Sequence, residues 1–301
     1  MSLRSIPSLP SLLRALTAGA VCWAPAVPVT HAQDAAQPAW DSVQSLLARP
    51  AILTGGYRRY AFPRRDLTVQ IGDVTVAPGL ALGGWVGFAG PPDHSSVMGD
   101  LVVTATELPS VLQALLANDL EVTAIHNHLT GEQPQVLYLH IHAHGPATTV
   151  ARGIAGALER TAIPRPVAAA AEPVALDTAR IFKALGVAGR AAGRVANLTF
   201  ALIPQPVRIG ADTMLPALAL ASPVNLQLVA GGRVVTSGDL AVLAGRVQPV
   251  LRALSSNRIT PTAVHSHLIG ESPGVTYIHF WGDGSLETVL AGLRAALDAA
   301  R

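Results

Sequence analysis

Short runs in which apolar and polar residues alternate cover much of the chain, and helical spacing covers most of the rest. In a strand, side chains two apart share a face, so the alternation over residues 122–128 and 136–144 predicts two strands. Gly131 and Pro134 between them suit a chain reversal, which predicts antiparallel pairing. The same patterns predict strands over 57–62, 67–74, 80–88 and 100–104, and helices over 107–118, 147–159 and 286–300.

The second half of the chain repeats the first. Gly99-Asp100-Leu101 recurs as Gly238-Asp239-Leu240, and the segment around His126 recurs around His265 without a gap. A repeat of this kind indicates that one structural unit is built twice. The predicted fold class is therefore α+β, with two tandem homologous units, each a mostly antiparallel sheet backed by helices.

The predicted boundaries follow from the repeat and from local composition. A stretch rich in proline and alanine between the copies is typical of a connection. Asp41 and Asp177 are expected to cap short helices that open the two units. The predicted division is a signal peptide over 1–32, a first repeat over 40–162, a linker over 163–175 and a second repeat over 176–301.

The first 32 residues have the features of a cleaved signal peptide. Arg4 and Arg14 give a weakly positive start, an apolar run follows, and Thr30-His31-Ala32 suits cleavage. Prolines interrupt the run, which is too short to span a membrane. We therefore expect an exported protein, periplasmic or extracellular, with no membrane span after cleavage. Cys22 offers lipoprotein anchoring as an alternative, although the residue before it suits a lipoprotein signal poorly.

Charge excludes one class of partner. The chain has 21 Lys and Arg against 19 Asp and Glu, and Arg4 and Arg14 of the leader account for the excess. No basic stripe with interleaved aromatic residues occurs, so nucleic acid is not expected as a partner. If Cys22 leaves with the leader, no cysteine remains for a disulfide or a thiolate ligand. The expected partner is an unidentified small molecule or a component of the cell envelope.

Histidine is concentrated in two windows at equivalent positions of the repeats. Each copy contains His-x-His-x3-Glu-x7-His, and histidines two apart on a strand project together. Three imidazoles and one carboxylate suit Zn²⁺ or another divalent transition metal, with an open position for water. The candidate metal ligands are His126, His128, Glu132, His140, His142 and His144 in the first copy and His265, His267, Glu271 and His279 in the second.

Three interpretations of these windows are open. The first is a metal centre, for which zinc is the best match in each repeat. The second is a structural cluster in which the histidines form hydrogen bonds without an ion. The third is metal-free catalysis, with Glu132 or Glu271 as general base beside a histidine. The copies also differ, because Trp281 stands where the first copy has His142.

The remaining polar residues are expected to be structural. Asp100 and Asp239 each follow a glycine and are expected in turns. Tyr138 and Tyr277 alternate with the histidines and are expected to face the core. No glycine-rich phosphate loop, nucleophile elbow or zinc-protease helix motif occurs. The arginines beside the first strand are expected to form a solvated edge: Arg58, Arg59, Arg64 and Arg65.

Six blocks carry a resemblance to a known family: His126-Asn127-His128-Leu129, Gly131-Glu132, Tyr138-Leu139-His140, His265-Ser266-His267, Glu271-Ser272-Pro273 and His279-Phe280-Trp281. They resemble the DUF1259 family, whose mycobacterial members are called LppY/LpqO lipoproteins. The resemblance covers nearly all of the mature chain and implies an exported, duplicated domain without a settled activity. The leading hypothesis is an exported metal-binding protein. The alternatives are a metal-dependent hydrolase of the cell envelope and a metal-free envelope binding or assembly module.

Overall fold

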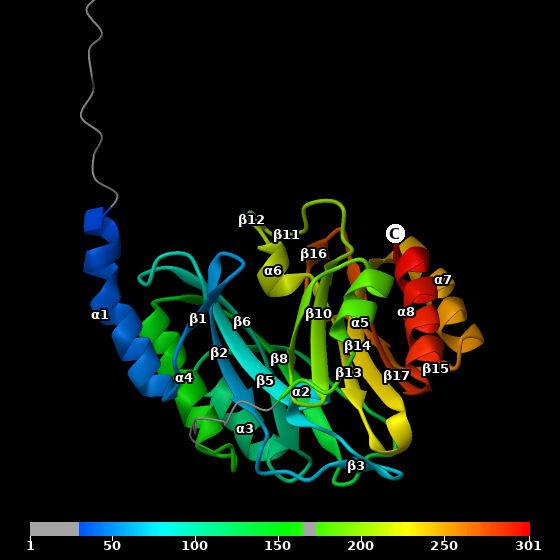
Figure 1. Ribbon diagram of the computed structural model, residues 1–301. Coiled ribbons are helices and arrows are strands. Elements are labelled where there is room, and N and C mark those ends of the chain that lie inside the picture. Colours follow the sequence, from blue (N-terminus) through cyan, green and yellow to red (C-terminus); the bar gives the residue numbers. More distant parts are fainter. Residues whose placement is uncertain (1–29, 165–172) are drawn as a thin grey trace, which may run out of the picture. The chain divides into compact units, whose positions relative to one another are not determined.

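A computed structural model describes residues 30–164 and 173–301 (Figure 1). Most of the expected signal peptide and positions 165–172 of the expected linker lie outside the described residues. Residues 36–301 form one compact unit, and the packing described below lies within it.

The first repeat contains four helices and eight strands among the described residues. In chain order they are α1 Thr30–Leu47, β1 Ile52–Thr54, β2 Tyr57–Pro63, β3 Gln70–Ile71, β4 Val74–Thr75, α2 Pro78–Ala81, β5 Gly83–Ala89, β6 Ser95–Thr104, α3 Leu108–Leu116, β7 Glu121–His126, β8 Val136–Gly145 and α4 Ala147–Leu158.

The second repeat has the same succession with small additions. Its elements are α5 Thr178–Leu185, β9 Gly189–Ala192, β10 Val195–Ala201, β11 Arg208–Ile209, β12 Asp212–Thr213, α6 Pro216–Ala219, β13 Ala221–Leu228, the 3₁₀ turn η1 Ala230–Gly232, β14 Val234–Leu243, α7 Ala244–Ser256, β15 Ile259–His265, β16 Glu271–Ser272, β17 Val275–Gly284 and α8 Leu286–Ala300.

Each repeat forms a six-stranded sheet, and the two sheets have the same topology. The strand orders are β1-β2-β5-β6-β8-β7 and β9-β10-β13-β14-β17-β15, with antiparallel pairing between neighbours. The predicted fold class is therefore confirmed: two similar α+β units stand in tandem, each with an antiparallel sheet.

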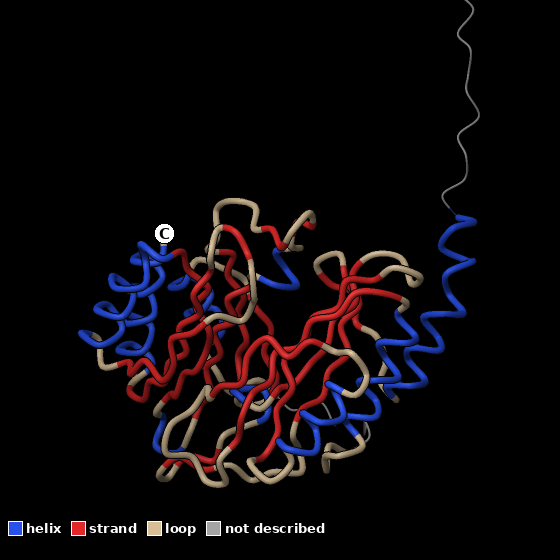
Figure 2. The backbone as a smooth tube through the Cα atoms, turned by 180° about the vertical axis from the view of Figure 1, so that it is seen from behind, coloured by secondary structure: helices blue, strands red, loops and turns tan. Residues whose placement is uncertain are grey.

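Helices cover one face of each sheet, and the other faces meet in the middle of the unit (Figures 1 and 2). Helices α3 and α4 pack with α1 on the first sheet, and α7 and α8 pack with α5 on the second. Two further apolar clusters, one around Tyr138 and one around Tyr277, include residues of both repeats. No helix among the described residues is long and apolar enough to cross a membrane.

Each repeat sends its short second helix onto the sheet of the other. In α2 the Leu80 carbonyl accepts a hydrogen bond from Asn225 Nδ2 of β13 at 2.8 Å. In α6 the Leu218 side chain packs over β5, where a Cβ on Gly87 would stand 2.5 Å from Leu218 Cδ1. Glycine is therefore required at position 87 for the close approach. This exchange joins the repeats through backbone and side-chain contacts.

The predicted elements closest to the histidines are confirmed. Strand β8 begins at Val136 as predicted and pairs antiparallel with β7, and the closing helices begin at Ala147 and Leu286. Asp177 caps α5, because its Oδ1 accepts a hydrogen bond from Arg180 N at 3.0 Å.

Three local predictions are wrong. Asp41 lies inside α1 instead of capping a helix, and residues 67–74 contain only the two-residue strand β3 and the start of β4. Strand β6 begins at Ser95, five positions before the predicted start, so Asp100 lies in the middle of a strand and not in a turn. Asp239 likewise lies within β14. A buried position in a strand is unusual for a carboxylate, and this makes both residues candidates for a site.

The expected solvated arginine edge is also wrong for Arg64. Its side chain has 0% exposure and pairs with Asp66 at 2.8 Å and with Glu107 at 2.7 Å. It also donates to the Val102 carbonyl at 2.9 Å. Buried guanidinium groups are stable only when their donors are satisfied, and here carboxylates on both sides satisfy them.

Candidate metal centre

The central strands bring histidines and aspartates into one row on each sheet. In the first sheet Asp100 of β6 is paired in register with His140 of β8. In the second, Asp239 of β14 is paired with His279 of β17. Because neighbours in register point to the same face, each aspartate and histidine share the face that looks toward the other repeat.

Strands β7 and β15 supply the remaining rings. Their last residues are His126 and His265, and His128 and His267 follow in the loops. Reciprocal bonds hold these loops together: Thr123 Oγ1 donates to the His267 carbonyl and Thr262 Oγ1 donates to the His128 carbonyl, both at 2.6 Å.

The rings of the two repeats lie against one another in a single group. Ring centroids of His140 and His267 are 3.6 Å apart, and those of His128 and His279 are 3.9 Å apart. The equivalent residues His126 and His265 are also 3.9 Å apart. The sequence predicted one site in each repeat, but the structure brings both histidine sets together. The histidine cluster below means six residues: His126, His128, His140, His265, His267 and His279.

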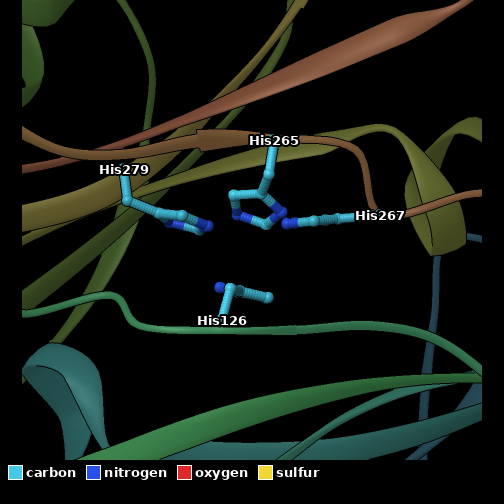
Figure 3. A group of neighbouring side chains, drawn as sticks. All are labelled: His126, His265, His267 and His279. Carbon is cyan, nitrogen blue, oxygen red and sulfur yellow. The ribbon is translucent and has the colours of Figure 1, made fainter.

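Two groups in this cluster have the geometry to hold a metal ion. In one, ligand atoms of His126, His265, His267 and His279 all lie within 4.8 Å of one another. Figure 3 shows these four rings turned toward a common point. The other group draws on the first repeat and shares His126: it consists of Asp100, His126, His128 and His140.

Eight buried polar atoms of the cluster and its aspartates have no hydrogen-bond partner among the described residues. They are the Nε2 atoms of all six cluster histidines together with Oδ1 of Asp100 and Asp239. Native proteins leave few buried polar groups unpaired, and each one costs about 1–3 kcal/mol. These atoms are nitrogen and oxygen donors of the kind that could hold a metal ion.

Backbone contacts fix the orientation of the rings. Nδ1 of His265 lies 3.0 Å from the Ser266 carbonyl, and Nδ1 of His279 lies 3.3 Å from the Gly238 carbonyl. A carbonyl can only accept, so Nδ1 carries the proton and Nε2 keeps a lone pair. Nδ1 of His126 lies 3.4 Å from the Asn127 carbonyl and has the same relation.

Tyrosines pack against the outer rings of the cluster. Tyr138 stacks on His128 with centroids 3.5 Å apart, and Tyr277 stacks on His267 at 3.6 Å. Tyr277 donates its hydroxyl hydrogen to the Ala219 carbonyl at 2.8 Å, and Tyr138 donates to the Ala81 carbonyl. Both tyrosines are buried, as the sequence predicted, but in the layer between the two sheets.

Burial shapes the electrostatics of the cluster in a way that suits a metal. It lowers the pKa of His126 to about 3 and holds the pKa values of His128 and His267 far below their usual range. Neutral imidazole is the form that ligates metals. Burial also raises the pKa of Asp100 to about 8, against the opposing charge of Arg59, and raises that of Asp239. A bound cation would stabilise both carboxylates as anions.

The two glutamates of the repeated motif lie outside both candidate groups. Glu132 Oε1 accepts a hydrogen bond from Val136 N at 3.4 Å, and Glu271 Oε1 accepts one from Val275 N at 3.1 Å. Each carboxylate therefore closes the turn that leads into the next strand, a role typical of short acidic or polar side chains near turns.

His142 and His144 also lie outside the candidate groups. His142 is next along β8 on the same face as His140, but its Nδ1 contacts Glu121 Oε2 at 3.3 Å. Its ring meets that of His144 edge-on, with centroids 4.6 Å apart. This pair forms a smaller polar group at the end of the strand.

Sequence reasoning missed Asp100 and Asp239 as site residues. The signal that could have found them is a charge in the interior of an apolar alternating run. Val97, Leu101 and Val103 around Asp100 are all buried. An acid at such a position requires a partner of opposite charge, whereas a glycine before it only suggests a turn.

The centre opens onto a cavity between the two sheets. Its volume is about 830 Å³. His128, His140 and His267 reach it, as do both aspartates. A molecule in this cavity would therefore have access to the cluster.

The fold and site define a duplicated α+β protein in which two sheets enclose one histidine cluster. The family model described as "Domain of Unknown Function (DUF1259)" matches residues 41–160 and 179–299. The chain belongs to this family, and the two matches agree with the duplication. No curated protein matches the sequence.

Two solved structures show a weak likeness. A trimeric bacterial microcompartment shell protein, PduB, is 13% identical with a TM-score of 0.21, over 83% of this chain and 89% of its own. EtuB from Clostridium kluyveri is 15% identical with a TM-score of 0.20, over the same shares.

Proposed function

We propose that this protein binds at least one divalent transition-metal ion at the histidine cluster, and that both repeats supply ligands to it. The observation that carries the proposal is the set of eight buried, unpaired nitrogen and oxygen atoms that face one another. Imidazole nitrogen with one or two carboxylate oxygens is a donor set typical of zinc and similar ions.

The ligands would come from defined elements. In the group of four imidazoles, His126 comes from β7, His265 from β15, His267 from the loop that follows β15, and His279 from β17. Asp100 or Asp239 would complete or neutralise the centre. A bound ion would act as a Lewis acid toward molecules in the cavity.

The competing interpretation, a structural cluster without an ion, is less favourable in energy. It leaves the Nε2 atoms of all six rings without a partner among the described residues, and backbone carbonyls contact Nδ1 in the rings of His126, His265 and His279. Each buried group that stays unpaired costs about 1–3 kcal/mol.

Metal analysis of purified protein tests the proposal. Protein stripped with chelator is reloaded with zinc or cobalt, dialysed and analysed by plasma mass spectrometry beside His267→Ala/His279→Ala. We expect stoichiometric metal in the wild type and affinity about 100-fold lower or worse in the variant. The control is His94→Ala/His144→Ala, which removes two exposed histidines and should leave binding unchanged.

Two results would overturn the proposal. One is wild-type protein that takes up none of zinc, cobalt, nickel, copper or manganese. The other is equal loss of metal in the control variant, which would assign binding to surface histidines. Circular dichroism of each variant shows whether a loss of metal reflects a loss of fold.

We further propose that the protein acts outside the cytoplasm, as its first 32 residues indicate. Fractionation of cells that express the full chain tests this, with the N-terminus of the mature protein determined by mass spectrometry. Cleavage after Ala32 is the expected result, and uncleaved protein in the cytoplasm would contradict it.

A further inference from the structure

Residues in register across the strands of a sheet form a row, and the rows beside the histidine cluster differ between the repeats. In the first sheet, Arg59 of β2 is in register with Gly87 of β5, which is in register with Met98 of β6. The equivalent row of the second sheet runs from Arg190 of β9 through Asn197 and Asn225 to Ser237, Trp281 and Thr260. At the position of Arg59 the second repeat therefore has an amide, and its cation lies one strand further from the centre.

In the second repeat the amides are used within the protein. Asn197 Nδ2 donates to the Gly79 carbonyl at 2.7 Å and to Asn225 Oδ1 at 2.8 Å. Asn225 in turn donates to the Leu80 carbonyl. These bonds hold α2 onto the second sheet, so this side of the cavity has its polar groups satisfied.

In the first repeat the Arg59 guanidinium remains available to a ligand in the cavity. The Arg59 guanidinium lies over the Trp85 ring, 4.3 Å from its centroid, and both residues line the cavity. No carboxylate among the described residues lies within ion-pair distance of Arg59, because Asp100 contacts His128 and His140 instead. Stacking on Trp85 fixes the plane of the guanidinium. The Tyr57 side chain lies beside it, and a guanidinium has five N–H donors, so further N–H groups are left for a ligand.

The other charges of the cavity favour an anion as well. Arg65 and Arg190 line the cavity as exposed residues, and among the described residues its lining acids are Asp100 and Asp239 at the centre. With a metal ion bound to these aspartates, the rest of the cavity would carry net positive charge. Trp85, Met98 and Leu218 supply an apolar wall beside the arginine.

We propose that the cavity binds a small organic carboxylate, with its carboxyl group on Arg59 and its hydrocarbon part against Trp85. The inference extends the proposed function and rests on it for the second contact, because the far end of the ligand would reach the metal centre. A guanidinium edge binds a carboxylate through two parallel hydrogen bonds, and it binds phosphate by the same geometry.

Calorimetry with two probes tests the inference. Succinate and inorganic phosphate are titrated separately into wild-type protein, metal-loaded and metal-stripped, and into Arg59→Gln. We expect succinate to bind loaded wild type and to bind Arg59→Gln about tenfold more weakly or worse. Arg58→Gln is the matched control, because Arg58 is the neighbouring arginine of β2 and lies over the Trp40 ring outside the cavity lining; the affinity should be unchanged.

Metal content measured on the same samples separates the two proposals. Arg59→Gln should keep its full metal content. If the protein holds metal but neither probe binds, or if Arg59→Gln binds succinate as the wild type does, the carboxylate site is refuted and the metal centre stands. If no metal is bound but succinate still depends on Arg59, the metal proposal fails and the anion site stands alone.

Two further outcomes decide the ligand class and guard against misfolding. Phosphate that binds tighter than succinate would overturn the carboxylate assignment in favour of a phosphate ligand. Should Arg59→Gln fail to fold, Arg59→Lys carries the test, since it keeps the charge but not the two-pronged edge. Affinity for succinate should then fall about tenfold, and unchanged affinity would overturn the role of Arg59.

Discussion

The two repeats agree where the histidine cluster lies and differ one row away from it. The row with Asp100 and His140 has its counterpart in Asp239 and His279, down to the register of the strands. The next row has Arg59 in one sheet and Asn197 in the other. The comparison teaches that the duplication kept a two-sided centre but changed the place of the cation beside it: Arg59 lies on β2 of one sheet, whereas Arg190 lies on β9, one strand further out, in the other.

The largest effect should come from acid acting on the shared cluster in metal-free protein. The six imidazoles have folded pKa values below their unfolded value of about 6.5, so their neutral forms favour folding above that pH. As pH falls below about 6.5 the unfolded chain takes up protons first. Each imidazole then costs up to about 1.4 kcal/mol per pH unit.

The two aspartates change stability with pH in the opposite direction, and they are two groups against six histidines. Their folded pKa values are raised, to about 8 for Asp100, so their contribution is present at low pH and is lost as pH rises from about 4 toward 8. Urea denaturation of metal-free protein between about pH 6.5 and 5 should show a net loss of stability, because six imidazoles outnumber two carboxylates over this range. Stability that rises on acidification would show that the aspartates outweigh the histidines and would contradict the account.

A smaller effect on folding stability is expected at the buried Arg64, where the two repeats differ in sequence. At the equivalent position the second repeat has Leu202, which is buried with no carboxylate at the positions equivalent to Asp66 and Glu107. Arg64→Leu should therefore destabilise the protein by about 3–5 kcal/mol, because Glu107 is left without its partner. Arg64→Leu combined with Glu107→Leu should recover much of that loss, since the second repeat folds without the pair.

Urea denaturation of the single and double variants measures this difference. The matched change in the second repeat, Leu202→Ala, should cost about 2–5 kcal/mol through the cavity it leaves. A single Arg64→Leu variant as stable as the wild type would show that the ion pairs contribute nothing to the fold.

The smallest effect should come from the two stacked tyrosines, which the repeats share. Tyr138→Phe and Tyr277→Phe each leave one backbone carbonyl without its donor, at Ala81 and Ala219. Each change should cost about 1 kcal/mol of stability and leave metal affinity nearly unchanged. Thermal denaturation and metal titration measure the two quantities. A large loss of metal affinity in either variant would make the hydroxyl part of the centre.

Sequence patterns predicted the fold class because both repeats depend on local signals. The alternation of residues 136–144 correctly predicted where β8 begins, and the capping residue Asp177 correctly predicted where α5 begins. The failures occur where long-range packing decides. Residues 67–74 look like a strand in isolation, but most of them form the segment that crosses to the other sheet.

The candidate site was predictable in its residue types and not in its assembly. Same-face spacing of His126 and His128 predicted convergence within one repeat. It could not predict that the rings of one repeat meet those of the other, because no periodicity in the chain reports how two sheets pack. Arg59 was missed for the same reason, since a strand residue faces solvent or a cavity according to what packs opposite.

The measurement that tests the central claim most directly is the metal stoichiometry of two matched single variants, His126→Ala and His265→Ala, beside the wild type. A centre shared by both repeats predicts that either substitution weakens the metal held by the group of four imidazoles, because His126 and His265 both belong to that group. If each variant instead keeps half of the metal with wild-type affinity, the repeats hold independent sites and the account of one shared centre is wrong.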